Sequence, residues 1–278
     1  MSLDSARLDT ALDTARTALL AERVAEGHWE GELSSSALST AVACAAMQHV
    51  QTATGTEEHC ALIQGGLHWL AEHANADGGW GDTTKSLSNI STTTLCWATF
   101  HAVPGALEEY AEVVAAAEQW LTKAAGGVTP DYLAPAIIAR YGKDRTFSVP
   151  ILTHCALAGK GRWKDVIQLP FELAALPRNW FAALRLPVVS YALPALIAIG
   201  QCRHQHRPSW NPFTRVLRNA AREKTLQVLE QIQPSNGGFL EATPLTSFVT
   251  MSLAGCGLAD HPVARKGIEF LHASVRAD

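Results

Sequence analysis

The sequence lacks any apolar run long enough to cross a membrane, which takes about 20 residues of hydrophobic helix. The nearest approach, residues 186–200, is short and is interrupted by Pro187 and Pro194. Residues 1–15 carry acidic side chains and no apolar segment of the kind that a secretory signal needs. Together these absences make the cytoplasm the expected compartment.

Strong charge of either sign is also missing, since the net charge is −4 and only 17% of the residues are charged. Proteins that bind nucleic acids carry a basic excess or a basic patch, so no nucleic-acid partner is expected. Disordered chains combine low hydrophobicity with high charge, whereas 47% of these 278 residues are hydrophobic. The composition therefore predicts a folded globular protein with material for one large or two modest domains.

The six cysteines are scattered and contain no CxxC pair, so we expect free, buried thiols rather than a disulfide framework. The run Cys202-x-His204-x-His206 resembles a set of metal ligands only in composition. On a helix, residues two apart point in very different directions and do not converge on one ion. No metal site is predicted here.

Helical periodicity dominates the chain, and alternating strand patterns are scarce. In residues 107–123 the apolar positions recur with a period of 3.6, and glycines follow at 126 and 127. Residues 6–24 show a similar stripe. The polar runs 34–36 and 91–94 are expected to cap helices that end near residues 50 and 103. We therefore predict an all-α fold.

A repeated unit is the most informative pattern in the sequence. It consists of a helix, a turn of the form Gly-x-aromatic, a polar stretch and a second helix; the turns are Gly27-x-Trp29, Gly78-x-Trp80 and Gly237-x-Phe239. Glycine permits a positive φ and a close backbone approach, and an indole N–H can hold a loop carbonyl. Stacked helix pairs of this kind bury a shared core and can close into an α/α toroid.

A fourth unit begins at Lys266-Gly267-x-x-Phe270-Leu271, which aligns with Gly66-x-x-Trp69-Leu70. Asp278 then stands where Asp77 stands in the earlier unit, and the next residues of the pattern would be Gly-x-Trp. Because the sequence ends there, the expectation is a fragment or a natural short form of a longer repeat protein.

The repeats resemble degenerate QW repeats of the squalene–hopene cyclase and oxidosqualene cyclase family. The family pattern is Gln-x-x-x-Gly-x-Trp, and Gln233-x-x-x-Gly237-x-Phe239 keeps its glutamine and glycine. The other two units have Arg23 and Ala74 at the glutamine position. We expect Trp29, Trp80, Gln233, Gly237 and Phe239 to stabilise the repeats rather than to contact substrate.

Further segments are similar to the same family and stand in the same order. One of them carries Pro170 and Glu172 in the run Trp163-x-x-x-Ile167-x-x-Pro170-x-Glu172. The segments are residues 27–47, 163–181, 211–231 and 261–271. The resemblance covers most of the chain.

The resemblance implies an α/α barrel built from residues 1–205 and an incomplete second barrel that begins at residues 206–278. The substrate cavity of the family lies between its two barrels, so Phe171, Glu172, Trp180 and Tyr191 are candidates to line it, with core packing as the alternative. The segment 166–200 is either a buried helix or a peripheral, monotopic contact with the inner membrane face.

The resemblance also implies an isomerase that cyclises squalene or another polyprene lipid without a metal or organic cofactor. Alkenes are weak bases, so their protonation needs a strong acid, such as one of two carboxyl groups that share a proton. The family's Asp-x-Asp-Asp motif is absent, and no two aspartates have the spacing Asp-x-Asp. This chain alone is therefore predicted to be inactive.

Two other functions remain open at this stage. One is a zinc-dependent α/α toroid of the protein prenyltransferase type. The other is a relative that binds lipid without catalysis.

Overall fold

The computed structural model describes residues 4–29, 34–177 and 192–277, and this part of the chain is helical without a named β-strand. The prediction of an all-α fold is confirmed. The chain divides into two compact units, Met1–Ser35 and Ser36–Asp278, which are described separately. None of the described helices combines the length and the apolar character that a membrane span requires.

The N-terminal unit consists of helix α1 (Ser5–Ala21) and the turn that follows it. The Asp4 carboxylate caps the helix by accepting a hydrogen bond from the backbone N–H of Ala6. The indole N–H of Trp29 donates to the carbonyl oxygen of Leu19 at 2.5 Å, and the Arg23 guanidinium donates to the Gly27 carbonyl oxygen. Local hydrogen bonds therefore shape this unit.

The second unit alternates long helices with short connections. Its elements are α2 (Ala37–Thr54), α3 (Cys60–Glu72), α4 (Ile90–Ala102), α5 (Ala106–Glu109), α6 (Ala111–Ala125), α7 (Pro130–Tyr141), α8 (Arg145–Leu157), the 3-10 helix η1 (Phe171–Ala175), α10 (Leu193–His206), α11 (Pro212–Ile232), the 3-10 helix η3 (Phe239–Glu241), α12 (Thr243–Ala254) and α13 (Pro262–Ala273).

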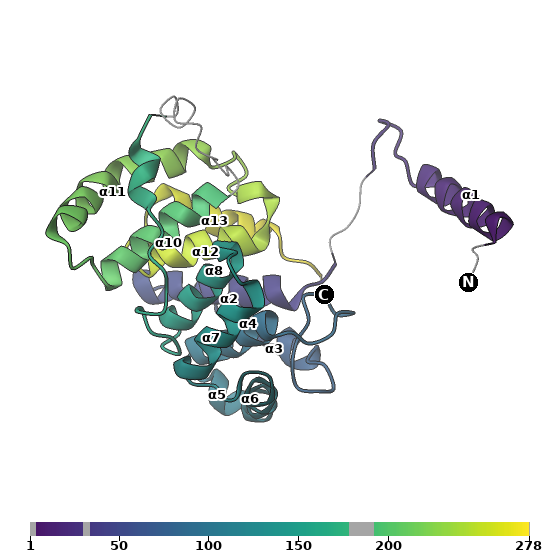
Figure 1. Cartoon of the computed structure of the whole chain (residues 1–278), viewed down its shortest axis with the longest axis horizontal. Coiled ribbons are helices and arrows are strands. Elements are labelled where there is room, and N and C mark those ends of the chain that lie inside the picture. Colours follow the sequence, from purple (N-terminus) through teal and green to yellow (C-terminus); the bar gives the residue numbers. More distant parts are fainter. Residues whose placement is uncertain (1–3, 30–33, 178–191, 278) are drawn as a thin grey trace. The chain divides into compact units, whose positions relative to one another are not determined.

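Five of these helices form an inner ring: α2 contacts α4, α4 contacts α8, α8 contacts α10, α10 contacts α12, and α12 returns to α2. Most residues of these helices are buried, whereas only a minority are buried in α3, α6, α7, α11 and α13. In Figure 1, α6 and α11 lie at the edge of this unit. The arrangement is that of an α/α barrel.

The expected division into residues 1–205 and 206–278 stays a prediction, and the contacts across residue 205 are as follows. Helix α12 packs against α2, and α13 packs against α12. Phe248 and Met251 of α12 belong to the same buried cluster as Ala41 and Val42 of α2. The two compact units meet between Ser35 and Ser36 in the sequence.

Local details differ from the sequence-based expectations in two places. The helix expected at residues 107–123 breaks at Tyr110, so that α5 and α6 are separate. Helix α4 is capped by Asn89, whose side chain accepts hydrogen bonds from the N–H groups of Ser91 and Thr92. Asparagine is as good a cap as serine and stands earlier in the chain. The expected Ser36 cap on α2 is present.

The three Gly-x-aromatic turns share their backbone geometry, with φ of 87° at Gly27, 85° at Gly78 and 84° at Gly237. Trp80 is fully buried, and its indole N–H donates to the Leu70 carbonyl oxygen at 2.9 Å. The acceptor therefore lies in helix α3, not in a loop as expected.

The turn at Gly237 uses a different side chain for the same purpose. Gln233 donates to the carbonyl oxygens of Gly237 at 2.9 Å and Val263 at 3.1 Å, while Phe239 is buried. A Cβ atom at Gly237 would collide with the carbonyl of Lys266 on α13. Glycine is required here both for the positive φ and for the close approach.

Candidate functional site

Residues 163–177 form a strap that runs along α10 and carries two of the predicted site residues. The Val166 carbonyl oxygen accepts a hydrogen bond at 2.8 Å from the Arg203 side chain. The Gln168 amide donates to the carbonyl oxygens of Leu169 and Gly200, each at 2.8 Å. These bonds satisfy backbone groups that would otherwise be buried without partners.

Phe171 begins η1 and is completely buried against α10. A Cβ atom at Gly200 would lie 2.9 Å from the Phe171 Cβ and 3.0 Å from the Leu169 carbonyl oxygen. The missing side chain at Gly200 therefore lets the strap approach the helix closely. The ring of Phe171 lies 6.0 Å from that of His204.

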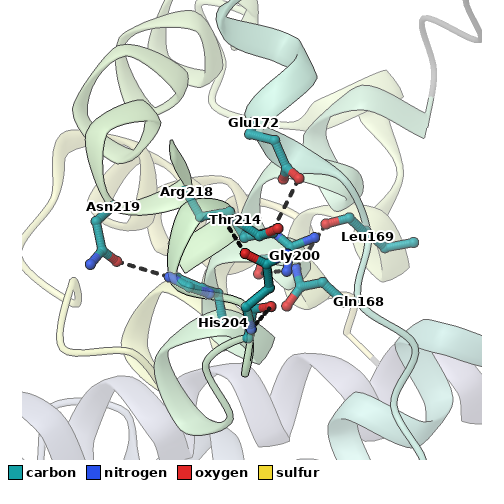
Figure 2. A network of polar contacts seen from close by, with 10 residues as sticks. Gln168, Leu169, Glu172, Gly200, His204, Thr214, Arg218 and Asn219 are labelled. Atoms are coloured by element: carbon teal, nitrogen blue, oxygen red, sulfur yellow. Dashed lines mark hydrogen bonds and ion pairs between the residues drawn. The ribbon is translucent and has the colours of Figure 1, made fainter. Parts of the chain in front are cut away.

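Glu172 connects the strap to α11 through an ion pair (Figure 2). Its Oε1 accepts a hydrogen bond from Nε of Arg218 at 3.1 Å, and the two side chains are only 11% and 13% exposed. The second oxygen, Oε2, is buried and has no hydrogen-bond partner among the described residues. This oxygen is free to accept a hydrogen bond from a water or a bound group.

His204 is the next buried polar residue in Figure 2. Its Nε2 lies 2.8 Å from Oδ1 of Asn219, so Nε2 carries the proton and Nδ1 is a hydrogen-bond acceptor. This Nδ1 is buried and unpartnered. Burial lowers the pKa of His204, which keeps the ring neutral at pH 7.

The site thus presents two buried acceptors, Glu172 Oε2 and His204 Nδ1, and their partners Arg218 and Asn219 are adjacent on α11. The Glu172–Arg218 ion pair and the His204–Asn219 hydrogen bond link the strap and α10 to α11. These contacts fix the position of the strap relative to α10 and α11.

Comparison with models of protein families shows to which family the chain belongs. The model of the squalene-hopene cyclase N-terminal domain matches residues 12–192. The chain belongs to this family. A search of curated proteins finds no match.

In this cyclase-family chain, two of the four predicted site residues lie in the part that the structure describes, and two lie outside it. Phe171 and Glu172 are neighbours in η1, but Phe171 points into the core while Glu172 reaches α11. Trp180 and Tyr191 lie outside the described residues. Sequence reasoning missed Arg218 and considered His204 only as a metal ligand, because the contacts of both residues depend on how α10 and α11 pack and leave no local pattern.

Segment 166–200 ends with the first residues of α10, and for these residues the structure favours a buried helix over a membrane contact. Residues 197–200 of α10 are fully buried in the inner ring, whereas Leu173 and Leu176 of the strap are partly exposed.

The Cys202, His204 and His206 side chains do not meet. Cys202 is buried, His204 faces Asn219, and the His206 ring stacks on Trp163 at 4.2 Å. Within residues 4–29, 34–177 and 192–277 no three metal-ligating side chains gather around one point.

Proposed function

We propose that this chain supplies the N-terminal barrel of a squalene–hopene cyclase-like triterpene cyclase. The observation that carries the proposal is the family match over residues 12–192. The reaction would be a proton-initiated cyclisation of squalene or a similar polyprene, which belongs to terpenoid or hopanoid biosynthesis. The acid that protonates the alkene would come from outside this sequence, which has no Asp-x-Asp pair.

Within that function, residues 36–277 would form one wall of the substrate cavity and a second barrel would form the other. Glu172 would position the strap through Arg218, and Trp180 and Tyr191 would face the hydrocarbon. An aromatic face stabilises cationic intermediates in a dry cavity. No cofactor is needed for this chemistry.

A polyprene substrate partitions into lipid, so we also propose peripheral contact with the inner membrane face through segment 166–200. The partly exposed side chains of Leu173 and Leu176 are consistent with an interfacial surface. Flotation with lipid vesicles tests this contact. Recovery of the chain with vesicles supports it, and recovery only in the soluble fraction contradicts it.

The central test combines binding with turnover. Purified chain is titrated with squalene in detergent while its thermal transition is followed, and the mixture is analysed for cyclic products. We expect a higher transition temperature and no product. A transition unaffected by squalene contradicts the polyprene proposal, and product formation by this chain alone contradicts the missing acid.

Two further measurements distinguish the alternatives. Stoichiometric zinc in the purified protein would favour the prenyltransferase type. Squalene binding that persists without turnover after a family catalytic half is added would favour a non-catalytic lipid-binding relative.

A further inference from the structure

Two histidines outside the candidate site are in contact, although 213 positions separate them in the sequence. His59 is the residue before α3, and His272 lies in the last turn of α13. Nε2 of His272 lies 3.0 Å from Nδ1 of His59, and the ring centroids are 4.9 Å apart with the ring planes at 84°. This contact joins the start of α3 to the end of the last helix.

The position of His59 is fixed by a side chain of α2. The amide oxygen of the buried Gln51 accepts a hydrogen bond from the backbone N–H of His59 at 2.6 Å, and its amide nitrogen donates to the Cys60 sulfur at 3.6 Å. His59 itself is only 4% exposed. A side chain that its neighbours already hold in place loses little freedom when it binds a ligand.

The hydrogen bond between the two rings uses a single proton. A neutral imidazole has one N–H and one nitrogen with a lone pair, so one of the two facing nitrogens donates and the other accepts. When both rings carry the proton on the nitrogen that faces away, both facing nitrogens direct a lone pair toward the same point. Neutral imidazole is the commonest metal ligand among protein side chains. A metal ion can therefore take the place of the shared proton.

The spacing of the facing nitrogens fits this exchange. Two ligands that each lie about 2.0–2.1 Å from a tetrahedral zinc ion are about 3.3–3.4 Å apart, slightly more than the 3.0 Å between the two nitrogens. His272 is half-buried, so water reaches the contact. Because the described residues bring no third metal-ligating side chain to this point, water completes the coordination.

We propose that His59 and His272 together bind a divalent transition-metal ion that clips the end of α13 to the start of α3. Zinc, nickel and copper are among the ions that imidazole ligands suit. A clip that closes a long segment stabilises a protein chiefly by restricting its unfolded chain, and the segment closed here spans 213 positions. An ion that binds the folded chain more tightly than the unfolded one raises the free energy of unfolding.

The clip is independent of the proposed cyclase function, because neither histidine belongs to the candidate site and its test requires no turnover. With two side chains and water as its ligands, it holds the ion reversibly. The test therefore starts from protein that has been treated with EDTA, and it uses nickel. Analysis of zinc in the purified protein stays a separate measurement.

In the experiment, the EDTA-treated full chain is dialysed and titrated with nickel chloride, and its thermal unfolding is followed with and without nickel. We expect the midpoint temperature to rise by at least about 3 °C at saturating nickel. Calorimetry should show one more ion bound per chain than in His272→Gln, which removes one of the facing nitrogens. A midpoint that nickel leaves unchanged overturns the proposal.

Three variants locate the effect. His59→Gln and His272→Gln should each abolish the rise, and unfolding without nickel verifies that both variants fold. His68→Gln is the matched control, because the side chain of His68 on α3 is 66% exposed and should not contribute to the clip. A rise that persists in both His59→Gln and His272→Gln, or that is lost in His68→Gln alone, overturns the proposal.

Copper gives a readout that does not depend on stability. With one equivalent of copper(II), the electron paramagnetic resonance spectrum of the full chain should show coupling to two imidazole nitrogens. The spectrum of His272→Gln should show the loss of one of them. A spectrum that this substitution leaves unchanged contradicts the assignment of His272 as a ligand.

Discussion

His154 is fully buried on α8, where its Nε2 lies 3.2 Å from both the Leu95 carbonyl oxygen and the Thr99 hydroxyl. Burial and the neighbouring His49 lower its pKa to about 3, and burial lowers that of His49 to about 4. Both rings are therefore neutral in the folded protein, while in the unfolded chain they titrate near 6.5.

This difference predicts acid sensitivity with a definite sign. Between pH 6.5 and about 4 the unfolded chain binds more protons, so the free energy of unfolding falls as the pH falls. At pH 5 we expect a loss of about 2 kcal/mol for His154 alone, relative to pH 7.5. Urea unfolding at the two pH values measures it.

The control is His154→Gln, which removes one titrating group and should reduce the loss between pH 7.5 and 5. Asp77 and Asp144 have lowered pKa values, so the stability that they contribute is lost only at lower pH, below their usual value of 3.8. A free energy of unfolding that stays constant or rises toward pH 5 would contradict the prediction.

A second prediction at the residue scale concerns the Glu172–Arg218 ion pair. Glu172→Gln leaves a nearly buried guanidinium without its counter-charge, so we expect a loss of about 2 kcal/mol in the free energy of unfolding. Chemical denaturation measures the loss. Glu72→Gln is the matched control, because the His68–Glu72 pair is 66% and 59% exposed and should contribute almost nothing. Equal effects of both substitutions would argue against a structural ion pair at the strap.

At the scale of elements, the close contact between the strap and α10 is possible because Gly200 has no side chain. Gly200→Ala places a Cβ 2.9 Å from Phe171, and we expect a loss of about 1–3 kcal/mol from overpacking. Gly65→Ala on α3 is the control, since its Cβ would meet nothing within 4 Å and alanine favours a helix. The midpoint temperature of thermal unfolding should fall for Gly200→Ala and rise for Gly65→Ala. An unchanged midpoint for Gly200→Ala would contradict the close approach of the strap to α10.

The Trp80 turn gives a further test of an element. Trp80→Phe keeps most of the buried ring but removes the hydrogen bond to Leu70, and we expect a loss of about 1 kcal/mol. Trp29→Phe should cost less, because Trp29 is 46% exposed. Denaturant midpoints of the two variants make the comparison. A larger loss for Trp29→Phe would show that burial does not govern the strength of these turns.

The sequence supports prediction of elements better than of their contacts. Helix α1 and the Gly-x-aromatic turns were predictable, because periodicity and a positive φ at glycine are local properties. The break at Tyr110 and the cap at Asn89 had no decisive local signal. Neither did the pairing of Glu172 with Arg218, since it depends on how the strap, α10 and α11 pack together.

For the whole molecule, the decisive feature is the contact between α12 and α2 within one barrel. Residues 206–278 alone would expose Phe248, Met251 and Ala254, which belong to the buried cluster. We expect this piece to aggregate when it is expressed separately, and size-exclusion chromatography with calorimetry measures the outcome. The full chain is the control. A monomeric piece with a cooperative thermal transition would contradict the expectation.

The same contact has a consequence during protein synthesis. About 190 residues separate the end of α2 from the start of α12, so the surface of α2 that α12 covers emerges from the ribosome long before its cover exists. At ordinary elongation rates that interval lasts roughly 10–40 s, which is long enough for chaperones to bind an exposed apolar helix. Helix α2 therefore reaches its buried position only after α12 has been synthesised.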